Sequence, residues 1–99
     1  MKKFREIGLT VLFSKESRNF IAYSPALDIS TCAATFEKAK KRLEELLVIF
    51  FEELEENGTL DEVLDECGWH KVKTKKENKW IPPRFIAQTE ETFKIPCQR

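Results

Sequence analysis

The stretch from Thr35 to Gly58 has the pattern of one long amphipathic helix, and it constrains the fold more than any other. Thr35 is a good N-cap, Glu37 puts a carboxylate in the first turn, and Gly58 is a natural stop. At about 100° per residue, one stripe of this helix collects seven apolar residues: Phe36, Ala39, Leu43, Leu46, Leu47, Phe50 and Leu54. Such a stripe must be buried, and we expect it to cover one face of a sheet.

Three segments before this helix have the pattern of short strands. Apolar residues alternate over 7–13, a polar turn follows at 14–19, and 20–23 form a second strand that pairs antiparallel with the first. Pro25 cannot donate to a sheet ladder, so it ends that strand or sits on an edge. Alternation resumes over 27–33, which predicts a third strand. The expected fold is therefore α+β: a small antiparallel sheet with one long amphipathic helix on one face.

The outer face of the long helix also carries apolar residues. Val48 and Ile49 project among charges on the side opposite the stripe. The charges are unusual, because Lys38, Lys40, Lys41 and Arg42 lie in the first half, whereas Glu52, Glu53, Glu55 and Glu56 lie in the second. An antiparallel copy would set basic half against acidic half, so we expect a homo-oligomer, dimer or higher, through Lys41, Glu45, Val48, Ile49 and Glu52. A solvated face with two stray apolar residues would give the same pattern.

The residues after Gly58 follow a different pattern from those before it. Thr59 and Glu62 form a capping box, which predicts a short helix over 60–67 that stops at Gly68. Residues 71–73 and 79–81 predict two strands around a turn at 75–78. Pro82 and Pro83 exclude regular structure locally, and 85–88 and 93–95 are candidates for further short strands. We expect one core over 1–74 and an irregular or short-strand extension over 75–99.

Composition excludes several kinds of chemistry. The net charge is zero, which argues against nucleic-acid binding by bulk charge. Three cysteines without a CxxC and a single histidine make a zinc site implausible, so we expect reduced thiols in a cytoplasmic protein. We find no signal peptide, no membrane span and no nucleotide-binding or hydrolase motif. We therefore predict no catalytic residues, no metal and no cofactor.

A basic segment, residues 69–80, supports an alternative function. Lysines lie between Trp69 and Trp80, and such a segment can grip phosphates and stack bases. It can equally be a solvated hairpin whose tryptophans pack inward. The alternative prediction is an RNA-binding accessory protein.

The order strand, strand, Tyr-x-Pro-x-Leu, strand and Thr-x-Glu-x-Ala helix resembles the HicB-like antitoxin family. The matching residues are Phe20, Ala22, Tyr23, Pro25, Leu27, Thr35, Glu37 and Ala39, and 58–69 is similar to the segment after the helix in stand-alone members. The resemblance covers about residues 4–74 and implies a partial RNase H-like β-β-β-α-β fold. The chain departs from the family in a shorter loop at 32–35 and in lacking an evident DNA-binding domain.

The resemblance implies a protein-binding module that covers the active surface of a small, basic, mRNA-cleaving HicA-like toxin, or an orphan relative. The expected partner contacts are Tyr23, Pro25, Asp28, Trp69, Lys71, Lys73 and Trp80. Two further hypotheses stay open. One is a metal-dependent nuclease that uses Asp28, the only acid we place on a sheet surface. The other is an orphan fold whose role is self-association alone.

Overall fold

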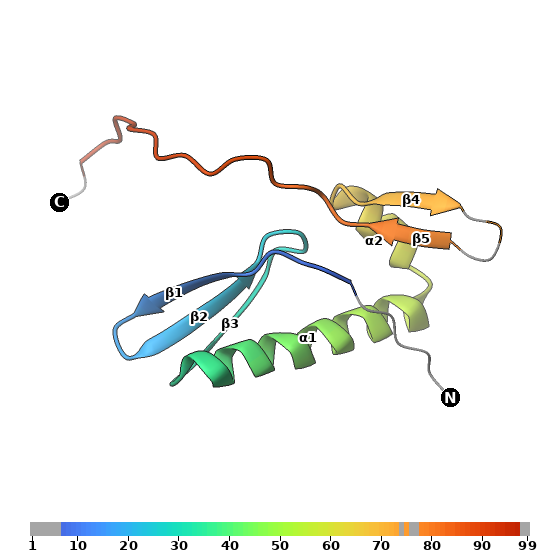
Figure 1. Ribbon diagram of the computed structural model, residues 1–99, viewed down its shortest axis with the longest axis horizontal. Coiled ribbons are helices and arrows are strands. Elements are labelled where there is room, and N and C mark those ends of the chain that lie inside the picture. Colours follow the sequence, from blue (N-terminus) through green and yellow to red (C-terminus); the bar gives the residue numbers. More distant parts are fainter. Residues whose placement is uncertain (1–6, 74, 76–77, 98–99) are drawn as a thin grey trace.

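The computed structural model describes residues 7–73, 75 and 78–97 and confirms the α+β fold class (Figure 1). Three strands lead into a long helix, and a short helix and a two-stranded hairpin follow it. The elements in chain order are β1 Leu12–Glu16, β2 Asn19–Ser24, β3 Ile29–Ala33, α1 Phe36–Asn57, α2 Leu60–Glu66, β4 His70–Lys73 and β5 Asn78–Ile81.

The first sheet is antiparallel with the order β1-β2-β3. Its first strand was predicted over 7–13, but β1 runs from Leu12 to Glu16. The register explains the shift, because Leu12 lies opposite Tyr23 and β2 ends one residue later, where Pro25 can donate no ladder hydrogen bond. Residues 7–11 therefore have no ladder partner on β2, and the turn moves toward residues 17 and 18.

The third strand also starts later than predicted. Leu27 and Asp28 belong to a turn, and β3 begins at Ile29. Asp28 has φ 55°, a left-handed conformation that a strand residue does not adopt. We call residues 23–28, from the last two residues of β2 to the residue before β3, the corner. Pro25 ends β2 there, as predicted.

Helix α1 begins and ends where the sequence predicts. Thr35 Oγ1 accepts a hydrogen bond from the backbone N–H of Lys38 at 3.1 Å, and Gly58 closes the helix at φ 68°. Ala39 and Leu43 pack with Ala22 and Ala33 of the sheet, so one face of the helix covers β2 and β3. The margins of the predicted stripe are more open, since Phe36 and Leu46 are exposed.

A second core cluster lies where α2 and the hairpin meet the corner. Ala26, Leu27, Leu64 and Trp69 are buried there. The predicted second helix is present, but the prediction that a capping box begins it is wrong. Thr59 makes no side-chain capping hydrogen bond, because its ψ of 9° lies outside the extended conformation that an N-cap uses.

The two predicted strands after α2 are β4 and β5, which pair antiparallel in a separate two-stranded sheet. The strand after the helices therefore does not extend the first sheet. Residues 76 and 77 of the predicted turn at 75–78 lie outside the described residues, and Asn78 belongs to β5. Residues 82–97 form neither helix nor strand, so the candidate strands at 85–88 and 93–95 are absent. The division between a core over 1–74 and an extension stays a prediction.

Candidate functional surfaces

The corner brings three of the predicted contact residues together. Tyr23 Oη donates a hydrogen bond to Asp28 Oδ1 at 3.0 Å across the half-buried Pro25. This hydrogen bond raises the pKa of Tyr23 above its ordinary value, with smaller contributions from desolvation and from the negative charge of Asp28. Asp28, which accepts this bond, has the left-handed backbone conformation at φ 55°. The corner is thus a preorganised polar surface that presents a phenol and a carboxylate.

Trp69 was predicted to contact a partner, but it belongs to the core. Its side chain is 2% exposed, and its Nε1–H donates to the carbonyl of Ala26 at 3.0 Å. Phe51 of α1 meets the indole edge-on, with ring centroids 6.1 Å apart. Burial removes Trp69 from the candidate contacts. Its hydrogen bond instead connects the corner to the residue that precedes β4.

The hairpin carries the remaining basic and aromatic candidates. Lys71 and Trp80 lie opposite each other on β4 and β5, and Lys71 Nζ is 5.7 Å from the centre of a Trp80 ring. The same ammonium forms an ion pair with Asp61 of α2 at 2.9 Å. Lys73 is exposed at the end of β4. RNA binding by this segment therefore loses one of its two stacking rings, and one of its lysines is already engaged by a carboxylate.

The outer face of α1 carries the five predicted self-association residues. Val48 and Ile49 are 39% and 51% exposed, which is high for large apolar side chains. Lys41 and Glu45 are exposed around them, and Glu52 is half-buried. They share the helix face that points away from the sheet, as the helical spacing requires.

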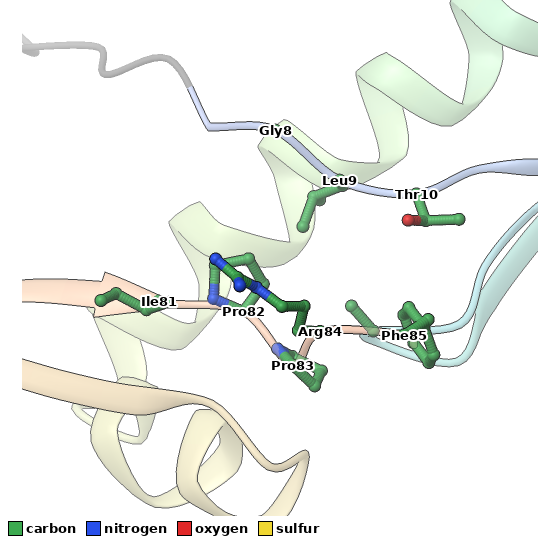
Figure 2. Close-up of a pocket in the computed structure, with 9 residues that line it drawn as sticks. Gly8, Leu9, Thr10, Ile81, Pro82, Pro83, Arg84 and Phe85 are labelled. Carbon is green, nitrogen blue, oxygen red and sulfur yellow. The ribbon is translucent and has the colours of Figure 1, made fainter. Parts of the chain in front are cut away.

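A cleft that the sequence did not predict separates residues 8–10 from residues 81–85 (Figure 2). Its volume is about 290 Å³, and Ala26 of the corner completes its lining. Its walls come from segments more than 70 residues apart, so no local pattern reveals it. The only signal in the sequence is the pair Pro82 and Pro83, which holds one wall extended.

Groups that could support other chemistry are dispersed. Within the described ranges, no cluster of three or more His, Cys, Asp or Glu side chains could hold a metal ion. Cys32 and Cys97 are exposed free thiols, and Cys67 is a half-buried one. Asp28, the acid of the nuclease hypothesis, is engaged with Tyr23.

Comparison with known proteins identifies no relative: no family model matches the chain, and neither a curated protein nor a solved structure is significantly similar to it. In the described part of the chain, no helix is both long enough and apolar enough to cross a membrane.

Proposed function

We propose that this chain is a non-catalytic protein-binding module that associates with itself through the outer face of α1. The supporting observation is the exposure of Val48 and Ile49 at the middle of a helix whose opposite face already covers the sheet. Large apolar side chains ringed by charges are typical of a protein contact rather than of a solvated helix face.

The charge pattern of α1 supports an antiparallel contact between two copies. Its basic residues Lys38, Lys40, Lys41 and Arg42 precede the apolar pair, and four of its seven acidic residues, Glu52, Glu53, Glu55 and Glu56, follow it. A two-fold axis near Val48 sets each basic half against an acidic half and buries the apolar pair at the crossing. A parallel contact would set like charges together.

Changing Val48 and Ile49 to Glu tests this contact. We expect the variant to stay folded and to lose the association across α1, because both introduced carboxylates would meet their symmetry mates at the crossing. Light scattering measures the mass and far-UV circular dichroism checks the fold. Arg18→Glu, in the exposed β1–β2 turn, is the matched control, since it changes the net charge by the same amount. An unchanged mass in the double variant would refute the contact.

The resemblance to HicB-like antitoxins gives the proposal its particular form. The partner would be a small basic toxin that cleaves mRNA. The corner, with Tyr23, Pro25 and Asp28, is a suitable contact surface, because it offers an acceptor-rich polar group on a fixed turn. Lys73 and Trp80 of the hairpin are further candidate contacts.

Co-purification from the native cell, with nuclease treatment, tests the antitoxin function. We expect a small basic protein in stoichiometric amount that is toxic when expressed alone and is neutralised by this chain. Asp28→Asn should weaken that complex, whereas Asp65→Asn on the exposed side of α2 should not. If the chain is recovered without a partner, the antitoxin function is contradicted. The α1 contact is then tested only by the mass of the Val48 and Ile49 variant. Binding of RNA that falls steeply with salt would instead favour the alternative function.

A further inference from the structure

Residues 82–97, which we call the arm, are extended and expose large apolar side chains. Ile86, Phe93 and Ile95 are 93%, 77% and 80% exposed, so the rest of the same chain leaves them almost uncovered. Figure 1 shows the arm leaving the hairpin and running beyond the sheet instead of packing back. The radius of gyration is 16.7 Å, whereas a compact chain of this length has about 13 Å.

The first sheet offers an unused edge. Strand β1 pairs with β2 on one side, and among the described residues no strand pairs with its other side. Its sequence, LFSKE, contains no proline and has one charge on each face, so an added strand has to match those charges. On the sheet face away from α1, Leu12 is exposed and its cross-strand neighbour Tyr23 is half-buried.

The arm has the pattern of a strand that fits this edge. Phe93 and Ile95 are two residues apart, so both would point to one face of a strand. Pro96 would end such a strand, because it cannot donate to the ladder. When the arm is aligned antiparallel to β1 with Phe93 opposite Leu12, Glu90 falls opposite Lys15. One register therefore pairs an apolar residue with an apolar residue and an acid with a base.

We propose that residues 89–95 of one copy add as a strand to β1 of a second copy, and that the two copies exchange arms reciprocally. Main-chain hydrogen bonds provide the affinity and the alternate side chains set the register. Phe93 extends the apolar surface that begins at Leu12, and Ile95 falls opposite Thr10, just before β1. The exchange uses neither the outer face of α1 nor the corner, so it stands independently of the proposed function.

The exchange buries apolar surface on both copies. Phe93 and Ile95 lie within the added strand and are 77% and 80% exposed in the single chain, and an aromatic side chain alone can bury about 150–250 Å². Reciprocal exchange buries two such strands and two acceptor edges, and stable interfaces bury about 1,200–2,000 Å² in total.

A charge exchange between two variants tests whether the arm acts on a second copy. Lys15→Glu and Glu90→Lys should each weaken self-association about fivefold, because each homodimer then holds two like-charged pairs. Mixing the two variants should restore the affinity, since both cross-strand pairs are then opposite in charge. Glu91→Lys is the matched control, because residue 91 falls opposite Ser14: alone it should leave self-association unchanged, and its mixed dimer with Lys15→Glu should still hold one like-charged pair.

A second pair of variants tests the apolar contact. Phe93→Ser with Ile95→Ser should weaken self-association at least a hundredfold, whereas Thr89→Ser with Thr92→Ser should leave it unchanged. Amide hydrogen exchange in β1 should slow as the concentration of the unmodified chain rises, and it should stay fast in the Phe93 and Ile95 variant.

Three results would overturn the exchange: no rescue on mixing, unchanged self-association in the Phe93 and Ile95 variant, or protection of β1 that does not depend on concentration. The last would mean that the arm folds onto its own β1. Repeating the charge exchange with Val48→Glu and Ile49→Glu in place separates the two contacts. If mixing restores the affinity in that background, the arm exchange is supported whether or not the α1 contact exists.

Discussion

Replacing Trp69 with Phe tests whether one buried ring holds the corner to the rest of the molecule. The substitution keeps an aromatic ring that can still pack edge-on against Phe51, and it removes the Nε1–H that donates to the Ala26 carbonyl at 3.0 Å. The site is dry, because Trp69 is 2% exposed and Ala26 is also buried.

The expected loss of stability has two parts. Phe lacks two ring carbons and the nitrogen of the indole, and losing two buried carbons costs about 1.5 kcal/mol at about 0.8 kcal/mol for each methylene equivalent. Leaving the Ala26 carbonyl without this donor costs about 1–3 kcal/mol more. The sum, about 2.5–4.5 kcal/mol, is a large fraction of the about 5–15 kcal/mol by which domains of this size are stable.

Urea unfolding followed by far-UV circular dichroism, at one fixed protein concentration, measures this loss. Trp80→Phe is the matched control, because it makes the same change at a half-buried site on β5 and should cost less than about 1 kcal/mol. The reasoning would be refuted if Trp69→Phe were no more destabilising than Trp80→Phe. That result would mean that the hydrogen bond and the packing at Ala26 contribute nothing net.

Two further predictions concern the ends of the first sheet. Thr35→Ala should lower stability by about 1 kcal/mol, because Thr35 Oγ1 accepts the Lys38 N–H at 3.1 Å, and Thr35→Ser should retain most of that contribution in the same urea assay. Asp28→Asn should lower the raised pKa of Tyr23 toward its ordinary value. Tyrosinate absorbance measures this pKa directly, because Tyr23 is the only tyrosine in the sequence. The neutral phenol is the donor, so its contribution to stability is present below about pH 10 and is lost as pH rises through the raised pKa. An unchanged tyrosine titration in Asp28→Asn would show that the Asp28 carboxylate does not hold the phenol.

The elements that the sequence predicts correctly are those set by local signals. Thr35 and Gly58 bound α1 because capping depends on a few neighbouring residues. Pro25 ends β2 because a missing N–H has the same effect in any fold. The apolar alternation of 7–13 gave a wrong strand, because alternation says which side chains share a face and not where a ladder partner exists.

Among the candidate contact residues, too, local signals predict correctly and long-range contacts do not. Tyr23 and Asp28 meet because they lie five residues apart around one turn. Trp69 could not be placed from sequence, since its burial depends on Ala26, which lies 43 residues earlier. A tryptophan beside lysines is compatible with a stacking platform and with a core residue, and only the tertiary contact decides between them.

The strand pairing of this molecule has a consequence for how fast it can form. Each strand pairs with its neighbour in the chain, β1 with β2, β2 with β3, and β4 with β5. No ladder in the described part must wait for a distant segment to arrive, so the entropy of closing long loops hardly limits the search. We expect refolding on the millisecond scale or faster. During synthesis, the first sheet and α1 can assemble before Trp69 has left the ribosome, which leaves docking of the hairpin as the last event.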